Sequence, residues 1–220
     1  MLESRDLLTL VWTGGAVMYP LLLCSIVSVG VILERLWSIT RAARAATRLH
    51  ELVAEAADEG GWSDALAVSR RDTSPLGNVY KAILSQEDLN DDIRTRIALQ
   101  RHAAAARTLK RNVWLVGTVG SLAPFIGLLG TVIGIVRAFE NMAATGSGGF
   151  AVVAAGISEA LIATAAGLLV GVLSIFSYNA FMVRIANLTA LWREWTDELL
   201  VRLTLPRQRE GSIARVAQSR

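Results

Sequence analysis

Three stretches of the sequence contain no charged residue and are each long enough to cross a lipid bilayer. They cover residues 7–33, 113–136 and 160–183. About 20 apolar residues suffice to span the hydrocarbon layer as a helix. The whole chain of 220 residues is 53% hydrophobic, which is high for a soluble domain. The sequence therefore predicts an all-α integral membrane protein with three transmembrane helices.

The first run is predicted to be a retained span rather than a signal peptide. It follows Glu3, Arg5 and Asp6 instead of a basic segment, it is longer than a signal-peptide core, and no A-x-A cleavage pattern follows it directly. With this span in place, the expected organisation is an N-terminal periplasmic flank and first span (1–34), a cytoplasmic helical insert (35–111), a second span (112–137), a short periplasmic loop (138–150), a third span (151–183) and a cytoplasmic C-terminal helix and tail (184–220).

The orientation rests on the distribution of basic residues. Arginine and lysine cluster after the first span, before the second span and after the third span, whereas the loop between the second and third spans has only Arg137 against Glu140. Because positive residues favour the cytoplasmic side, we expect a periplasmic N-terminus and a cytoplasmic C-terminus.

The insert is predicted to be helical, with its spans continuing into it. Gly60-Gly61 is expected to break the first long helix before a short one capped by Ser63, and Ser74-Pro75 is expected to open another. A long helix then starts near residues 88–92 and leads straight into the second span. The insert offers no convincing core of its own, so we expect it to pack against copies of itself. Pro206 is expected to end the C-terminal helix.

Several classes of function find no support in the residues. The single cysteine, Cys24, excludes an intramolecular disulfide and a cysteine-based metal site. His50 and His102 stand alone on polar helices and are expected at the surface. No catalytic triad, metal cluster, phosphate loop or basic stripe is present, so we predict no enzyme activity, no cofactor and no nucleic-acid partner.

Polar residues at the membrane are the candidates for function. Glu159 stands at the outer edge of the third run and Thr164 lies further inside it, while Thr131 lies in the second run. At ~1.5 Å per residue, the two hydroxyls come to similar depths in the outer half of the bilayer. Ionisable residues at such places mark ion pathways by default.

Two alternatives stand beside that interpretation. A membrane threonine can simply bond a carbonyl of its own helix, and a carboxylate at the edge of a span can simply be solvated. In addition, Glu159 and Thr164 are separated by roughly 140° around an ideal helix. One of the two therefore faces a pore and the other a seam between helices, and the sequence does not decide which.

Small residues recur at four-residue spacing in the second and third runs. Such spacing lets helices approach closely. The predicted packing positions are Gly127, Gly130, Gly134, Gly167 and Gly171.

Three segments carry a resemblance to a known family. GGAVMYPLLLCSIVSVGVILERLW, GSLAPFIGLLGTVIGIVRAF and ISEALIATAAGLLVGVLSIFSYNAF resemble the MotA/TolQ/ExbB proton-channel family, and length and topology favour its ExbB/TolQ branch. The resemblance covers residues 14–181 in order. One departure is Leu173, where the family commonly has proline.

The resemblance implies a function and an assembly. The family forms a ring, expected to be a pentamer, around a dimer of a single-span ExbD/TolR-like partner in the bacterial inner membrane. Proton flow through it drives a TonB/TolA-like periplasmic transducer, for import or envelope maintenance. Carried over by position, the pathway residues are Thr131, Thr164 and Glu159. The transported ion, H⁺ or Na⁺, is left open.

Two rival functions remain. A stator-like subunit of a surface motility motor shares the channel chemistry but moves a different partner. A passive membrane scaffold would use the small-residue seams alone, and its function would not depend on Glu159 or Thr164.

Overall fold

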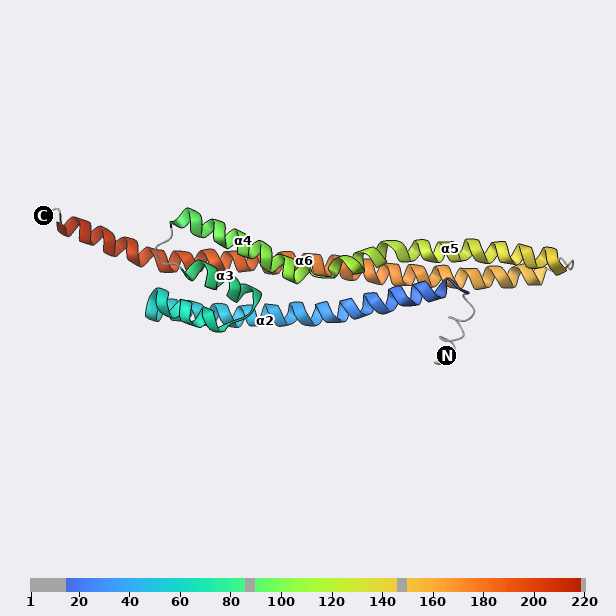
Figure 1. Ribbon diagram of the computed structural model, residues 1–220, viewed down its shortest axis with the longest axis horizontal. Coiled ribbons are helices and arrows are strands. Elements are labelled where there is room, and N and C mark those ends of the chain that lie inside the picture. Colours follow the sequence, from blue (N-terminus) through green and yellow to red (C-terminus); the bar gives the residue numbers. More distant parts are fainter. Residues whose placement is uncertain (1–14, 86–89, 146–149, 219–220) are drawn as a thin grey trace. The chain divides into compact units, whose positions relative to one another are not determined.

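A computed structural model describes residues 15–85, 90–145 and 150–218, and all regular secondary structure within these ranges is helical. Figure 1 labels the helices in chain order. They are α2 (Met18–Arg71), α3 (Pro75–Leu84), α4 (Asp91–Lys110), α5 (Val113–Thr145) and α6 (Phe150–Gln218).

The three predicted spans are found in α2, α5 and α6. By length and composition, each of these helices can cross a membrane. Only 17%, 28% and 28% of their most apolar windows are buried within the chain. The remaining apolar side chains need lipid or other protein chains to cover them, as expected of an integral membrane protein.

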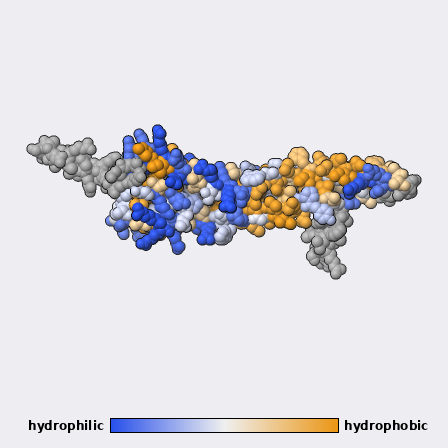
Figure 2. Space-filling view, viewed as in Figure 1, coloured by the Kyte–Doolittle hydropathy of each residue, from blue (hydrophilic) through white to orange (hydrophobic). Residues whose placement is uncertain are grey.

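The chain divides into two compact units. The first unit combines Met1–Arg35 with Asn112–Phe181, and the second combines Leu36–Arg111 with Met182–Arg220. In Figure 2, hydrophobic residues dominate the visible surface of the first unit, and hydrophilic residues dominate that of the second. The first unit therefore contains the apolar spans, and the second contains the predicted insert and C-terminal helix.

In the first unit, α5 and α6 run side by side in opposite directions (Figure 1). Their contacts pair residues in reverse order, from Gly134 against Ala160 to Gly117 against Tyr178. The start of α2 packs on this pair through a small apolar cluster, whose buried members are Met18, Leu21, Val119, Ala123 and Ala163.

The second unit has a well-buried core, which corrects our expectation about the insert. Tyr80 of α3 is completely buried, and Trp62 donates a hydrogen bond from Nε1 to the carbonyl oxygen of Leu84 over 2.8 Å. Trp192 and Leu199 of α6 are also completely buried. The core of this unit therefore combines apolar side chains of the insert with those of the C-terminal part of α6.

Both histidines belong to this core rather than to the surface. His102 of α4 is only 3% exposed, and its Nε2 lies 3.1 Å from Thr196 Oγ1 of α6. His50 is half-buried: its ring stacks on Trp195 with centroids 4.6 Å apart, and its Nδ1 lies 2.9 Å from the Tyr80 hydroxyl. The prediction of surface histidines is wrong, because the apolar stripes that cover them come from distant segments.

Some predicted helix boundaries hold and others need correction. Ser74 caps α3 as predicted, accepting a hydrogen bond from the backbone N–H of Gly77. The break expected at Gly60-Gly61 is confirmed, because Gly61 has the non-helical angles φ 67° and ψ −145° and divides α2 into two helical parts at a kink. The predicted N-cap Ser63 is itself helical. The helix α4 does not lead straight into the second span, because the chain leaves it at Arg111 and turns through Asn112 at φ 61°. Asparagine is among the few residues that adopt this conformation readily.

The predicted periplasmic loop and the predicted stop at Pro206 also differ from the structure. The helix α5 continues to Thr145, so residues 138–145 of that loop are helical, and α6 already begins at Phe150. Residues 146–149 and the N-terminal flank through residue 14 lie outside the described residues. The helix α6 passes Pro206 and ends at Gln218. The prediction assumed that the helical hydrogen bond lost at a proline would end the helix. Here the helix continues past that position.

Candidate functional site: a small-residue seam and a polar pocket

The glycines predicted to mediate packing line a close seam between α5 and α6. A Cβ atom on Gly167 would lie 2.6 Å from the Ala123 carbonyl oxygen, and one on Gly127 would lie 2.9 Å from the Ala163 carbonyl oxygen. Backbone atoms cannot yield easily at such distances. The two helices are therefore in backbone contact, and glycine is required where they touch. The other predicted glycines lie along the same seam: Gly130 faces Ala163, Gly134 faces Ala160, and Gly171 faces Pro124.

Thr164 faces this seam. Its Oγ1 donates a hydrogen bond of 2.8 Å to the carbonyl oxygen of Gly127 on α5. The side chain therefore does not bond its own helix, which was one of the two alternatives for a membrane threonine. The absence of a side chain on Gly127 lets the hydroxyl reach the neighbouring backbone.

Thr131 follows the other alternative. Its Oγ1 donates to the carbonyl oxygen of Leu128, one turn earlier in the same helix, over 2.7 Å. Gly130, beside Thr131, lies against Ala163, beside Thr164. The two threonines thus stand at neighbouring levels of the α5·α6 pair, and each hydroxyl donates to a different backbone carbonyl.

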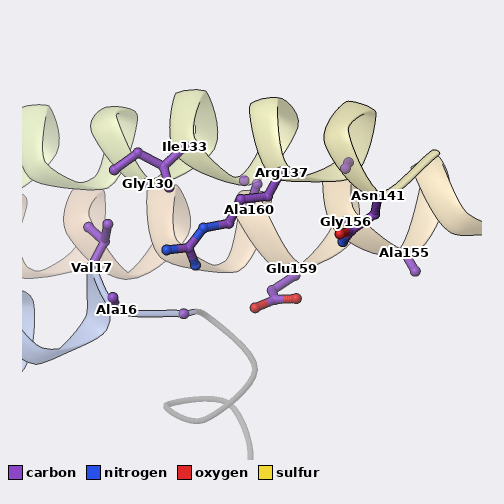
Figure 3. A pocket seen from close by; sticks show the side chains of 13 residues that line it. Ala16, Val17, Gly130, Ile133, Arg137, Asn141, Ala155, Gly156, Glu159 and Ala160 are labelled. Atoms are coloured by element: carbon purple, nitrogen blue, oxygen red, sulfur yellow. The ribbon is translucent and has the colours of Figure 1, made fainter. Parts of the chain in front are cut away.

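Glu159 lines a pocket of about 610 Å³ at the far end of the seam. The pocket is formed by the start of α2, the end of the second span on α5, and α6, and it also contains Arg137 and Asn141. Figure 3 shows that Arg137 and Glu159 extend from α5 and α6 toward the side on which Ala16 and Val17 lie. Both side chains are exposed, and neither forms a salt bridge within the described part of the chain.

The approach of the chain to Glu159 depends on a glycine. Gly15 has a φ of +71°, which side-chain-bearing residues rarely adopt, and a Cβ there would lie 3.6 Å from Glu159 Oε1. Among the described residues, the pocket lining contains one carboxylate and one guanidinium as its ionisable side chains, beside the amide of Asn141. These polar groups can hold water at the edge of an apolar span.

A second polar contact lies deeper in the first unit and was not predicted. Ser28 of α2 and Ser174 of α6 are each 2% exposed, and their hydroxyl oxygens are 2.7 Å apart. Neither serine is among the predicted site residues. The available signal was the scarcity of hydroxyl side chains in an apolar run, since each buried one needs a partner.

No group of three or more metal-ligating side chains occurs among the described residues. The polar side chains in the lining of the Glu159 pocket are one amide, one carboxylate and one guanidinium, and the spans add hydroxyl side chains. Such a set can pass or hold protons and hydrated cations.

Comparison with known proteins identifies the family to which the chain is similar. Residues 71–194 match the sequence model of the MotA/TolQ/ExbB proton channel family. The chain is 29% identical to the biopolymer transport protein ExbB of Pseudomonas putida, over 89% of this chain and 61% of the relative. It is 38% identical to the Tol-Pal system protein TolQ of Pseudomonas aeruginosa, over 47% of this chain and 43% of the relative. It is also 32% identical to the ExbB-like 1 protein of Synechocystis sp., over 77% of this chain and 68% of the relative.

These matches confirm the resemblance and its ExbB/TolQ branch. The matched segments span about three fifths of the ExbB proteins of Pseudomonas putida and Salmonella typhimurium, at 61% of each.

Proposed function

Because this chain belongs to the MotA/TolQ/ExbB proton channel family, we propose that it is a proton-channel subunit of an energy-transducing complex in the bacterial inner membrane. The complex couples the proton motive force to mechanical work on a TonB/TolA-like periplasmic partner. Its relatives named ExbB and TolQ support the branch. The observation that carries the proposal is the Glu159 carboxylate, placed in a polar pocket at one end of the small-residue seam.

The proposed ion pathway uses the three predicted residues in different ways. Thr164 donates its hydroxyl proton to the Gly127 carbonyl. In this proposal it stabilises the contact of α5 with α6 and fixes the orientation of α6. Glu159, about 140° around the helix from Thr164, is the group that faces the ion path and takes up protons from the periplasmic side. Thr131 of α5 is half-buried and donates to the Leu128 carbonyl of its own helix, and its oxygen lone pairs can still accept a hydrogen bond from a passing proton carrier.

The proposed assembly is a ring of five copies around a dimer of an ExbD/TolR-like partner. The exposed apolar surface of the spans supports an assembly of this kind, because more than 70% of each apolar window is not fully buried within the single chain. The partner would carry the carboxylate that receives the proton. The proposed orientation keeps the N-terminus periplasmic and the second unit cytoplasmic, as the basic residues predict.

A stator-like subunit of a surface motility motor is the second candidate. The family shared with MotA favours it, since the channel chemistry is the same. A passive scaffold is the third, and the glycine seam alone would support it. Genes for an outer-membrane transporter and a TonB-like protein beside this gene would favour import, whereas motility genes would favour the motor.

Native mass spectrometry of the protein from its own membranes tests the assembly. The proposal predicts about five copies with two copies of a short one-span partner. After reconstitution into liposomes, that complex should acidify the lumen when a pH gradient is applied. A lone oligomer without a partner, giving no proton flux, would support the scaffold instead.

A further inference from the structure

A second cavity lies between α3 and α4, which pack against each other in the second unit. Its volume is about 570 Å³, which is comparable to that of known small-ligand sites. Alanines such as Ala82 and Ala104 provide apolar surface in its lining. The polar groups come from both helices and from the turn that precedes α3.

The charged groups in the lining are both positive. Lys81 of α3 and Arg101 of α4 line the cavity, and no carboxylate does so among the described residues. Asp72, which precedes α3 by three residues, already accepts the backbone N–H of Ser74 at its Oδ1 over 2.6 Å. Two cations that share a cavity repel each other unless an anion lies between them.

Further donors extend this positive lining. The side chains of Asn78 and Thr73 also line the cavity, and like Lys81 and Arg101 they have no side-chain hydrogen-bond partner within the described residues. The hydroxyls of Ser85 and Thr108, by contrast, already donate to backbone carbonyls. Four side-chain donors that converge on one cavity can satisfy more oxygen atoms than a carboxylate offers, and they suit a phosphate group.

We propose that this α3·α4 cavity binds a phosphate-bearing anion, held by Lys81 and Arg101 with Asn78 and Thr73 as neutral donors. The alanine surface accommodates the carbon skeleton attached to the phosphate. This inference is independent of the proton pathway, because none of these residues belongs to the first unit.

Two sources can supply such a phosphate. The cavity includes Thr108, which is five residues before Val113, where the second apolar span starts. Five residues reach at most roughly 18 Å, so an anionic lipid headgroup lies within range. A soluble organic phosphate from the cytoplasm has the same chemistry.

The test compares two probes on the full-length protein in mild detergent. Dioctanoyl phosphatidylglycerol is titrated by native mass spectrometry, with the zwitterionic dioctanoyl phosphatidylcholine as its lipid control. Glycerol 3-phosphate is titrated by calorimetry. The double variant Lys81→Gln/Arg101→Gln is expected to weaken binding roughly tenfold or more, since it removes both charge-assisted contacts.

A charge-matched control separates the cavity from general surface charge. Arg70→Gln/Arg96→Gln removes the same net charge from exposed positions of the second unit outside the cavity, and should leave binding unchanged. Ala104→Glu should independently reproduce the loss by placing a negative charge in the lining. Binding of phosphatidylglycerol alone identifies a lipid site, and binding of glycerol 3-phosphate identifies a site for soluble phosphates. Equal affinity of the cavity variant and the control variant for both probes, or no binding of either probe, overturns the proposal.

Discussion

Thr164 of α6 donates its hydroxyl proton to the carbonyl oxygen of Gly127 on α5, over 2.8 Å. This bond links two spans across a seam that is otherwise made of small residues. It also distinguishes the two predicted pathway residues of α6. Because the Thr164 side chain points into the seam, Glu159, about 140° away around the helix, faces a different direction.

The first prediction concerns this bond. Thr164→Val keeps the shape of the side chain but removes the donor, so the Gly127 carbonyl loses a partner in an apolar layer. We expect a loss of about 1 kcal/mol in the stability of the membrane-embedded unit and reduced proton flux in liposomes. Thr164→Ser retains the donor and should behave like the wild type. If Thr164→Val and Thr164→Ser conduct equally well, the seam bond has no functional role.

The second prediction tests the backbone contact of α5 and α6. Gly167→Ala adds a methyl group 2.6 Å from the Ala123 carbonyl oxygen, so the helices must separate. Overpacking of this kind costs about 1–3 kcal/mol, and the melting temperature followed by circular dichroism should fall accordingly. Gly30→Ala is the matched control, because nothing lies within 4 Å of its added Cβ. A Gly167→Ala protein as stable as the Gly30→Ala protein would contradict the contact.

The third prediction concerns the buried serine pair. Ser28 and Ser174 exchange a hydrogen bond between α2 and α6. A double-mutant cycle with alanine at both positions should give a coupling of about 0.6 kcal/mol, the average for such bonds between membrane helices, and at most about 1.7 kcal/mol. Ser177→Ala serves as control, because its hydroxyl only bonds Leu173 of the same helix. Additive effects of Ser28→Ala and Ser174→Ala would show that the bond contributes nothing.

The fourth prediction is a dependence of stability on pH in the second unit. Thr196 Oγ1 donates its single proton to the Trp192 carbonyl, so it must accept from His102 Nε2, and His102 Nδ1 is left without a partner among the described residues. The pKa of His102 is lowered from 6.5 to about 4, chiefly by burial and also by the charge of Arg193, with Asp197 opposing the shift. Its neutral form is thus favoured in the folded state.

The sign of this effect follows from proton binding. Unfolded His102 takes up a proton below pH 6.5 and folded His102 only near pH 4, so its contribution is full above pH 6.5 and is lost as pH falls toward 4. Between pH 7.5 and 5.0 the loss is about 2 kcal/mol in the free energy of unfolding. Denaturation curves at the two pH values should show this loss in the wild type and a smaller one in His102→Leu. An unchanged difference in the variant would show that other groups cause it.

The spans and their seam were predictable because one local rule governs each. Absence of charge over more than 20 residues located the three helices, and four-residue spacing of glycine located the seam. The pairing of Thr164 with Gly127 was not predictable, since it depends on the register of α6 against α5. Periodicity within one helix gives the direction of a side chain but not the residue that it meets.

In the second unit, a helical pattern in the sequence of α4 could have predicted that His102 is buried. The buried face of α4 is Arg94, Ala98, His102, Ala105 and Leu109, a stripe of helical period. Its small and polar members gave it little hydrophobic contrast, so His102 was assigned to the surface. The core that covers it comes from residues about 90 positions away, Trp192 and Thr196, which no local pattern connects to α4.

The most direct test of the proposed function is proton flux through the purified complex reconstituted with its one-span partner. Glu159→Gln keeps the size of the side chain but cannot take up a proton, and Glu140→Gln is the matched control from the exposed surface of α5, outside the pocket. We predict that Glu159→Gln lowers lumen acidification roughly tenfold or more, while Glu140→Gln and the assembly of both variants stay unchanged. Wild-type flux in Glu159→Gln would contradict the proposed role of this carboxylate.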